Sequence, residues 1–329
     1  MADHGPRRAL LAAPGRFQVG PGPETPLGPG DVRLAVLATG ICGTDLATYR
    51  SGDADPHQVL GHEIVAHVTE TGGATDLPTG TRVMLRPMRS CHRCWYCASG
   101  HTHLCDHSKE LTLSFQRPGG FAEEVILRDA EPGDALPLAE EADITDGMWA
   151  EPLAVAVHSL NTLGGPRPAD PLLVIGAGPL GLCTTAAAAA RGLKVTVVEP
   201  RKARHATAHA AGASAVHLPH DLTGRYPWTV IAAGTPAALR QAIESTRPGG
   251  RISITALGPA PVPTLTHPVQ VSGSFGYNDE EFAQAAALIN DGTVRLGGAV
   301  SRRFPLAEIN AAFTYATEDP EAVKVAITP

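Results

Sequence analysis

The stretch PLLVIGAGPLGLCTTAAAAA, residues 171–190, decides the fold of the second half of the chain. An apolar strand runs into three glycines spaced G-x-G-x-x-G, and an alanine-rich helical segment follows. In such a turn the first glycine permits the tight bend, the second lets the backbone approach a pyrophosphate, and the third allows the helix to pack closely on the strand. The N–H groups at the start of the helix face the anion. We therefore predict that Gly176, Gly178 and Gly181 bind a dinucleotide.

The same stretch carries no charged residue over 20 positions, which is also the length of a membrane-spanning helix. Its glycines and Pro179 divide it into a strand, a turn and a helix, and this pattern is typical of a globular α/β domain. The start of the chain, MADHGPRRALLAAPG, has too short an apolar run for a secretory signal. We expect a cytoplasmic protein that does not enter the membrane.

Apolar strands alternate with helical segments from this stretch to about residue 277. The expected strands are PLLVIG (171–176), KVTVVE (194–199), SAVHL (214–218), WTVIAAG (228–234), RISITAL (251–257) and QVSGSFG (270–276). This alternation predicts a doubly wound parallel sheet, which is a Rossmann domain.

Glu199 ends the second of these strands, at the position where an acidic residue accepts hydrogen bonds from the adenosine ribose. A carboxylate there repels a 2′-phosphate and therefore favours NAD. Arg201, Lys202 and Arg204 follow directly, and an arginine near this point can accommodate the phosphate of NADP. We predict NAD, with NADP as the less favoured alternative.

The first 150 residues follow a different pattern, in which short runs alternate apolar and polar side chains between Gly and Pro turns. The runs at 31–39, 63–70, 81–87 and 121–128 are typical of β-strands. After the Rossmann pattern come a helix at 279–291, an amphipathic stretch at 306–317 and a last strand at 322–327. The length of 329 residues allows two domains with a core each.

Four of the six cysteines lie between residues 91 and 105, spaced C-x2-C-x2-C-x7-C. Four thiolates can surround one zinc ion tetrahedrally and leave no position for a substrate, so this set predicts a structural zinc site. An iron–sulfur cluster of the ferredoxin type would have a shorter last gap followed by proline, whereas Asp106 follows here. The alternative is a group of reduced cysteines without metal. The predicted ligands are Cys91, Cys94, Cys97 and Cys105.

Three other pieces of sequence could form a second metal site. ICGTD places Cys42 after an apolar strand, LGHEIVA places His62 and Glu63 where a strand begins, and WAEPLAVAVHSL places Glu151 at a helix start. Thiolate, imidazole and carboxylate all bind zinc, and a catalytic site keeps one position open. Taken singly, Cys42 is better explained as a strand end, and Glu151 as a carboxylate that the helix dipole favours. Their order along the chain, with the cysteine cluster in between, is more specific.

Together these motifs resemble those of the zinc-dependent medium-chain dehydrogenases, the alcohol dehydrogenase superfamily. The resemblance covers CGTD (42–45), LGHE (60–63), the cysteine cluster, PGGFAEEV (118–125), EPLAVAVH (151–158), VIGAGPLG (174–181) and GSFGY (273–277). Glu151 stands where simple alcohol dehydrogenases have cysteine, which is similar to the polyol branch with its sorbitol, threonine and glucose dehydrogenases. The resemblance implies an α/β protein with a GroES-like β-rich catalytic domain and a Rossmann domain. The catalytic domain would span 1–155 and 278–329, with a zinc lobe at about 88–107, and the Rossmann domain would span 156–277.

The resemblance also implies roles for particular residues. Cys42, His62 and Glu63 would hold the catalytic zinc, with Glu151 bound to it directly or through the zinc water. The four clustered cysteines would hold the structural zinc, which makes two zinc ions per chain. The expected cofactor contacts are Gly176, Gly178, Pro179, Leu180, Gly181, Glu199, Arg204, Leu257 and Phe275.

The implied reaction is reversible hydride transfer between a secondary alcohol and NAD, which gives the ketone. Zinc would act as a Lewis acid on the hydroxyl, and Thr44 would accept its proton. The alternative for Thr44 is a strand-end hydroxyl that satisfies the backbone. Many relatives have a relay histidine five residues after the zinc cysteine, and this chain has Ala47 there. The proton exit therefore stays open among water, Tyr49 and His57.

We expect a polyol, sugar or aminocyclitol-like substrate. The alternatives are a threonine-like or simple secondary-alcohol dehydrogenase and a nucleotide-binding relative without turnover. The net charge of −7 argues against a nucleic-acid partner, which requires a basic surface. The resemblance further implies a homodimer or homotetramer, often formed by pairing of Rossmann edge strands.

Overall fold

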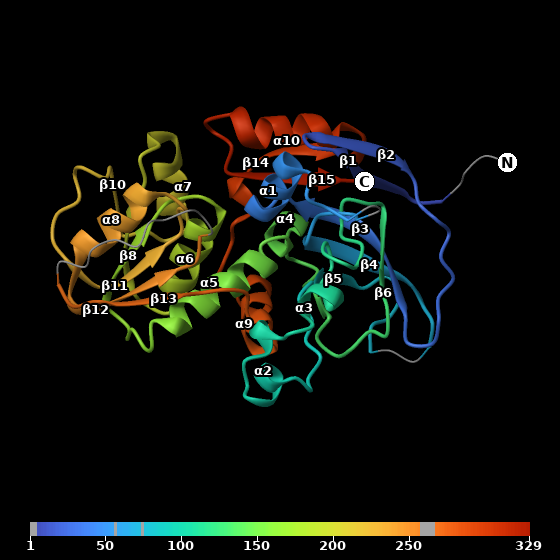
Figure 1. The fold of residues 1–329 in the computed structure, drawn as a ribbon, viewed down its shortest axis with the longest axis horizontal. Coiled ribbons are helices and arrows are strands. Elements are labelled where there is room, and N and C mark those ends of the chain that lie inside the picture. Colours follow the sequence, from blue (N-terminus) through green and yellow to red (C-terminus); the bar gives the residue numbers. More distant parts are fainter. Residues whose placement is uncertain (1–4, 56–57, 74–75, 257–266) are drawn as a thin grey trace. The chain divides into compact units, whose positions relative to one another are not determined.

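The computed structural model describes residues 5–55, 58–73, 76–256 and 267–329 (Figure 1). Leu257 and His57, both named above, lie outside the described residues. Contacts divide the described chain into two compact units. One unit is formed by the residues up to Glu151 together with Val300–Pro329, and the other by Pro152–Ala299.

A seven-stranded mixed sheet forms the centre of the first unit, in the order β14-β15-β3-β4-β5-β7, with β6 paired to β3. Its strands are β3 (Val32–Gly40), β4 (Glu63–Thr71), β5 (Arg82–Leu85), β6 (Glu124–Leu127), β7 (Ala135–Pro137), β14 (Val300–Pro305) and β15 (Lys324–Thr328). A separate antiparallel pair is formed by β1 (Arg7–Ala13) and β2 (Arg16–Pro21). The strands expected at 31–39, 63–70, 81–87 and 121–128 therefore correspond to β3, β4, β5 and β6.

The helices of the first unit are short. They are α1 (Gly43–Ser51), α2 (Trp95–Ala98), η1 (Thr102–Leu104), α3 (Ser108–Leu111), α4 (Ile144–Gly147), η4 (Leu306–Glu308) and α10 (Ile309–Glu318). The sheet's central strand, β3, alternates buried and half-buried side chains along most of its length, and its last three residues are all buried. Strand side chains alternate between the two faces of a sheet. The loss of alternating burial over the last three residues therefore shows that the end of β3, at Gly40, is buried on both faces.

The second unit contains a six-stranded sheet in the order β10-β9-β8-β11-β12-β13, and all of its strand pairs are parallel. Its strands are β8 (Pro171–Ile175), β9 (Lys194–Val198), β10 (Ala215–His217), β11 (Tyr226–Ile231), β12 (Thr246–Ile254) and β13 (Gln270–Gly273). The strand order reverses between β8 and β11, which is the switch point where doubly wound sheets bind dinucleotides. The predicted fold class is confirmed.

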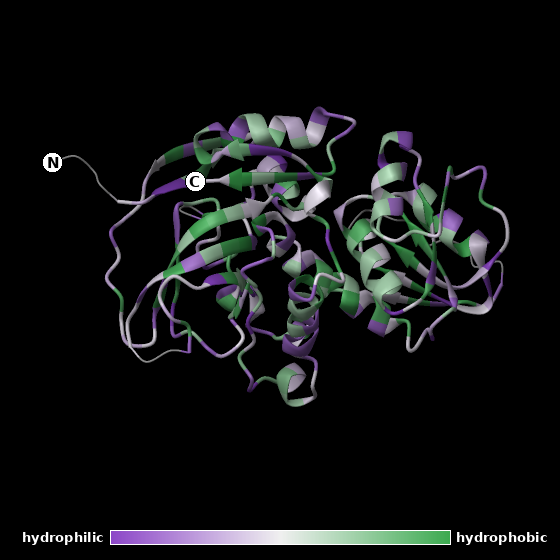
Figure 2. Ribbon diagram, turned by 180° about the vertical axis from the view of Figure 1, so that it is seen from behind, coloured by the Kyte–Doolittle hydropathy of each residue, from purple (hydrophilic) through white to green (hydrophobic). Residues whose placement is uncertain are grey.

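The helices of the second unit lie between these strands and at both ends of the strand series. They are α5 (Ala150–Thr162), α6 (Pro179–Ala190), η2 (Lys202–Arg204), α7 (His205–Ala210), α8 (Pro236–Ser245), α9 (Asp279–Asn290) and η3 (Gly297–Ala299). Figure 2 shows strands of the parallel sheet as largely hydrophobic, as expected for strands that helices cover on both faces. Within the described residues, no helix is long and apolar enough to cross a membrane, because the uncharged stretch 171–190 is divided between β8 and α6.

The observed division differs from the expected domain boundaries at 155 and 278. The second unit keeps residues up to Ala299, so α9 belongs to the parallel-sheet unit and not to the β-rich one. The reason is a buried polar contact between two helices of this unit. Glu281 near the start of α9 accepts hydrogen bonds from His158 Nδ1 (2.9 Å) and from Asn161 Nδ2 (2.7 Å), both on α5.

Candidate active site and metal centres

The glycine-rich turn between β8 and α6 has the geometry that its sequence predicts. Gly176 has a φ of +103°, which side chains rarely adopt, and a Cβ on Gly181 would overlap the carbonyl of Gly176. Gly178 is different, because a Cβ there would meet nothing closer than Arg204 Nη1 at 3.8 Å. Gly178 caps α6, and Pro179 occupies the first turn of that helix, where a missing N–H has no cost. The open space at Gly178 suits the approach of a pyrophosphate.

Glu199 lies against this turn, directly after β9. Its Oε2 accepts a hydrogen bond from the N–H of Ala177 (2.7 Å), and its Oε1 accepts one from the N–H of Arg201 (2.8 Å). Glu199 is thereby held within the glycine-rich turn, and each of its oxygens has a lone pair left for a ribose hydroxyl. Of the other expected cofactor contacts, Arg204 is half-buried beside Gly178, and Phe275, just after β13, is 55% exposed.

The sheet of the first unit brings Cys42, His62 and Glu63 together. Gly40 at the end of β3 pairs with Glu63 at the start of β4, so the residues that follow β3 and those that precede β4 lie side by side. One ligand atom from each of the three residues lies within 4.8 Å of the others. Sulfur, imidazole nitrogen and carboxylate oxygen in one cluster fit a zinc ion with three protein ligands and an open position.

Asp45 supports this cluster from α1, and it is 2% exposed. Its Oδ2 accepts a hydrogen bond from the N–H of Cys42 (2.9 Å), and its Oδ1 accepts one from the N–H of Gly61 (3.2 Å). The same Oδ1 lies 3.6 Å from Nδ1 of His62, a charge contact longer than a hydrogen bond. Burial disfavours a charged His62 ring, but the negative charges of Asp45 and Cys42 outweigh it and raise the pKa of His62. Asp45 therefore orients the imidazole and sets its electrostatic environment.

Lys324 is a member of this cluster that the sequence reasoning missed. It begins β15, where Ala326 pairs with Gly40 of β3, so Lys324 lies alongside the residues that follow β3. Its Nζ forms an ion pair with Oε2 of Glu63, and both side chains are buried. The signal in the sequence was a single charged residue inside the otherwise apolar strand AVKVAI, and a lysine at such a position requires a buried anion.

Glu151 lies close to the cluster without belonging to it. It is the second residue of α5 and is 8% exposed, and it is not among the three residues whose ligand atoms converge. Burial raises the pKa of Glu151 to about 7, with a further upward contribution from Glu63, against the charges of His62 and Lys324, which lower it. In this environment the carboxyl group of Glu151, beside the cluster, gains or loses its proton near neutral pH.

Thr44 places its Oγ1 3.5 Å from Nε2 of His62, so its hydroxyl points into the cluster. Tyr49, one of the residues considered for the proton exit, lies elsewhere. Its ring stacks on Phe17 at 5.2 Å between centroids and contacts Phe313 at 4.7 Å, and burial raises its pKa. Tyr49 is therefore a half-buried residue that packs against the core of the first unit.

The four clustered cysteines form a second group whose sulfurs all lie within 4.8 Å of one another. Backbone N–H groups point at them: Cys94 donates to Cys91 Sγ (3.3 Å), and Cys91 and His107 donate to Cys105 Sγ (3.3 and 3.4 Å). Such bonds favour thiolates, and backbone donors lower the pKa of Cys91 to about 6, whereas burial raises that of Cys97 to about 12. Four sulfurs without an open position fit a structural zinc ion. We call residues 90–107 the zinc lobe.

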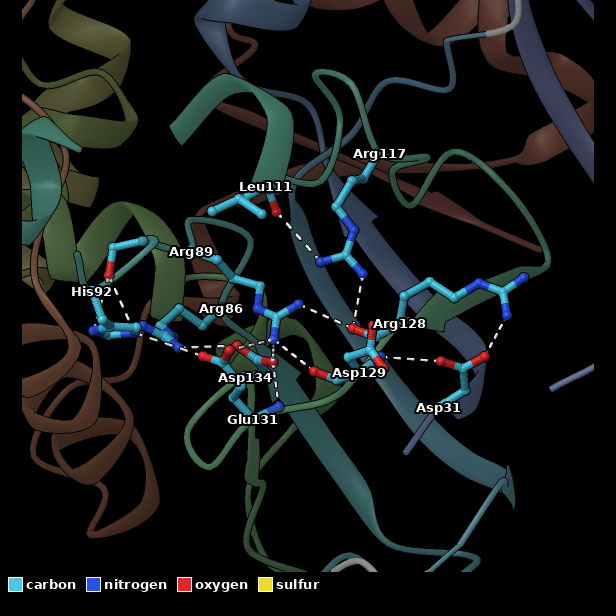
Figure 3. A network of polar contacts seen from close by, with 11 residues as sticks. Asp31, Arg86, Arg89, His92, Leu111, Arg117, Arg128, Asp129, Glu131 and Asp134 are labelled. Atoms are coloured by element: carbon cyan, nitrogen blue, oxygen red, sulfur yellow. Dashed lines mark hydrogen bonds and ion pairs between the residues drawn. The ribbon is translucent and has the colours of Figure 1, made fainter. Parts of the chain in front are cut away.

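A network of charged side chains fastens the base of the zinc lobe to the loop 128–134 (Figure 3). Arg89 donates to the carbonyls of Arg128 (3.0 Å) and Asp129 (2.7 Å) and forms an ion pair with Asp134 (3.1 Å). Arg86 pairs with the other oxygen of Asp134 at 2.9 Å, and this pair is almost fully buried. The network holds Cys91, two residues after Arg89, in a fixed position on the sheet.

Comparison with protein families matches both units. Residues 28–137 match the alcohol dehydrogenase GroES-like domain, and residues 179–291 match the zinc-binding dehydrogenase domain. The first match covers the ligand cluster and the zinc lobe, and the second begins in the glycine-rich turn.

Individual relatives match over most of the chain. L-threonine 3-dehydrogenase of Streptomyces avermitilis is 31% identical over 88% of this chain and 90% of its own length. A protein of Arthroderma otae named "probable D-xylulose reductase A" is 31% identical over 86% of each chain. A Sinorhizobium meliloti protein described as a zinc-binding dehydrogenase, solved bound to NADP, superposes with a TM-score of 0.89 at 26% identity over 98% of this chain and 99% of its own.

Proposed function

The chain belongs to the zinc-dependent medium-chain dehydrogenases of the alcohol dehydrogenase superfamily, and on this premise we propose that it oxidises a polyol or sugar hydroxyl to a ketone with NAD. The chain is a secondary-alcohol oxidoreductase of this family. One observation carries the proposal, namely the convergence of ligand atoms from Cys42, His62 and Glu63 within 4.8 Å. A polyol or sugar substrate is favoured by the similarity to D-xylulose reductase, and Glu151 distinguishes the chain from simple alcohol dehydrogenases.

The residues of the cluster have separate tasks in this proposal. Cys42, His62 and Glu63 would hold zinc, and a zinc ion bound there supplies the Lewis acidity that lowers the pKa of a substrate hydroxyl. Thr44 would take up the proton that the hydroxyl releases while its own hydroxyl proton passes on to water, since its Oγ1 points into the cluster. Asp45 keeps His62 in its orientation. The zinc lobe would hold a second zinc ion and serves the fold.

The proposed cofactor is NAD, and its nicotinamide ring accepts the hydride. Glu199, held at the glycine-rich turn, favours the unphosphorylated ribose of NAD. NADP is the second candidate, because Arg204 stands beside Gly178 and the S. meliloti relative was solved with NADP. Initial rates with NAD and NADP at equal concentration decide between them, and a higher kcat/KM with NADP would contradict the proposed cofactor.

A threonine-like activity is the second candidate for the substrate, because L-threonine 3-dehydrogenases are about as similar to the chain as D-xylulose reductase is. A panel of polyols, sugars, cyclitols, L-threonine and simple secondary alcohols separates these classes. We expect the highest kcat/KM with a polyol or sugar. Preference for L-threonine would replace the proposed substrate class and leave the zinc and nucleotide assignments intact.

Metal analysis tests the core of the proposal. The purified protein should contain about two zinc ions per chain, one for each ligand set, and chelation of the second should abolish turnover. A protein with one zinc and no activity on any alcohol in the panel would be a nucleotide-binding relative instead.

The edge strand β13 of the parallel sheet could pair with a second copy of the chain. The strand β13 ends the parallel sheet, and Val271 and Phe275 on and beside it are 44% and 55% exposed. An unpaired strand edge with exposed apolar side chains can pair with a second copy, so we propose a homodimer or a homotetramer built on it. Sedimentation should show this assembly, and Val271→Arg should dissociate it. A cytoplasmic location would keep the six cysteines reduced.

A further inference from the structure

Lys324 has an unusual environment for a lysine. Its side chain is 0% exposed, and that of its ion-pair partner Glu63 is 1% exposed. Removing an ammonium and a carboxylate from water costs several kcal/mol per ion, so such a pair persists only where the surroundings compensate for lost hydration. Glu63 is also one of the three converging ligands. The lysine therefore contacts a residue that the proposed metal must share.

The surroundings of the Lys324 ammonium are shaped to hold it. The indole ring of Trp149, fully buried, lies 5.1 Å from Nζ to the ring centroid, and the negative face of such a ring attracts a cation. The carbonyl of Ile41 accepts a hydrogen bond from Nζ at 3.5 Å. Gly40 leaves the necessary room, because a Cβ there would lie 2.8 Å from Cε of Lys324 and would overlap Oε2 of Glu63. Three separate segments thus build one site for one ammonium.

We propose that Lys324 is a positioning residue that binds one oxygen of the Glu63 carboxylate and leaves the other oxygen for the metal ion. Lys324 holds Oε2, and only Oε1 is offered to the metal ion. The inference rests on the proposed function, since it requires a metal ion at Cys42, His62 and Glu63. A carboxylate can bind a cation through one oxygen or both. With one oxygen from Glu63, a four-coordinate zinc keeps the fourth position that a substrate hydroxyl needs, whereas a second oxygen would compete for it.

Lys324 also competes with the metal for the charge of Glu63. Without Lys324, the Glu63 carboxylate of the metal-free protein would stay buried but lose its ion-pair partner, which is strongly unfavourable. Metal binding would relieve that cost, so loss of Lys324 should strengthen metal binding and slow turnover at the same time. A residue that only supports the local fold would act in the opposite direction, because a displaced ligand weakens metal binding, typically by about 10–100-fold.

The substitution Lys324→Met, which keeps length and removes charge, tests this difference. Zinc affinity of the second site is measured by competition with a chelator, using Zn²⁺ alone, and we expect it to rise about tenfold. We expect kcat to fall by a similar factor. With Co²⁺ in the second site, the visible absorption should weaken, since a fifth ligand atom lowers the intensity of tetrahedral cobalt. Lys194→Met, at an exposed lysine of β9, is the matched control and should change none of these readouts.

Gly40→Ala provides a second, independent variant that retains every charge. The added methyl group would overlap Oε2 of Glu63 and displace that ligand, so this variant should weaken zinc binding, the opposite of the change expected for Lys324→Met. If wild-type protein binds zinc only in the zinc lobe, the proposed function itself fails. If the wild type binds two zinc ions, but Lys324→Met leaves zinc affinity unchanged, or weakens it as Gly40→Ala does, and leaves cobalt absorption unchanged, the role assigned to Lys324 is wrong and the proposed function stands.

Discussion

The two groups of metal-ligating side chains differ in how the chain brings them together. The four sulfurs of the zinc lobe come from residues 91–105, and short local turns direct them to one point. The ligands of the buried cluster come from the end of β3 and the start of β4, and Lys324 reaches them from β15, nearly at the other end of the chain. The first group is a local structure, and the second exists only when the sheet is complete.

The difference extends to the chemistry of the two groups. The zinc lobe offers four like sulfur ligands, two of which accept hydrogen bonds from backbone N–H groups, and four sulfurs fill the coordination of one zinc ion. The buried cluster offers three unlike ligands surrounded by Asp45, Thr44, Lys324 and Glu151. We infer that the zinc lobe contributes stability and that the buried cluster contributes reactivity.

Removing one ligand from the buried cluster should give the largest effect. Cys42→Ala should lower the zinc content from about two ions to about one and reduce turnover roughly 10⁴-fold, because a catalytic metal contributes several kcal/mol and each 1.36 kcal/mol is a factor of ten. The thermal midpoint should stay close to that of the wild type, since the lobe zinc is retained. Cys183→Ala, at the buried cysteine of α6, is the control. Retention of both zinc ions in Cys42→Ala would contradict the ligand assignment.

The zinc lobe should respond to a change that leaves its cysteines untouched. Asp134→Asn removes the carboxylate between Arg86 and Arg89, and breaking a buried pair in this way costs about 3–5 kcal/mol. Urea unfolding should show this loss, and zinc should leave the lobe at a lower denaturant concentration, while turnover below the transition is unchanged. In Asp129→Asn the carbonyl that Arg89 contacts is retained, so this control should match the wild type. A loss of turnover without a loss of stability would show that the two groups are not separate.

Thr44→Val tests the chemistry of the buried cluster without removing a ligand. General acid–base groups typically contribute 10²–10⁴-fold, so turnover should fall about a hundredfold while both zinc ions remain bound. Thr44→Ser, which restores a hydroxyl, should recover most of the activity. If Thr44→Val turns over at the wild-type rate, the hydroxyl near His62 serves only the local backbone.

Local patterns were readable from the sequence, and long-range partners were not. The glycine-rich turn and the cysteine spacing each depend on residues a few positions apart, Glu199 follows at the end of the next strand, and the structure places them as expected. Lys324 could not be paired with Glu63, because that contact depends on β15 lying beside β3, a register that no local pattern specifies. The placement of α9 with the parallel-sheet unit is a second contact of this kind, since α9 is held by His158 of α5.

Substitution of Glu151 should have the smallest of these effects, and the effect appears in the pH dependence of the free energy of unfolding. Burial raises its pKa from 4.5 to about 7, so between these values the folded protein binds a proton that the unfolded chain releases. The resulting stability is complete below about pH 4.5 and is lost as the pH rises through about 7. In the Cys42→Ala background, which lacks the second metal, this group should lower the free energy of unfolding by about 2–3 kcal/mol from pH 5 to pH 8. Glu151→Gln should remove that part of the decline, whereas Glu318→Gln, at an exposed position, should not. Equal pH slopes with and without Glu151 would mean that its carboxyl group remains hydrated, and a hydrated carboxylate would be free to move toward the metal as a further ligand.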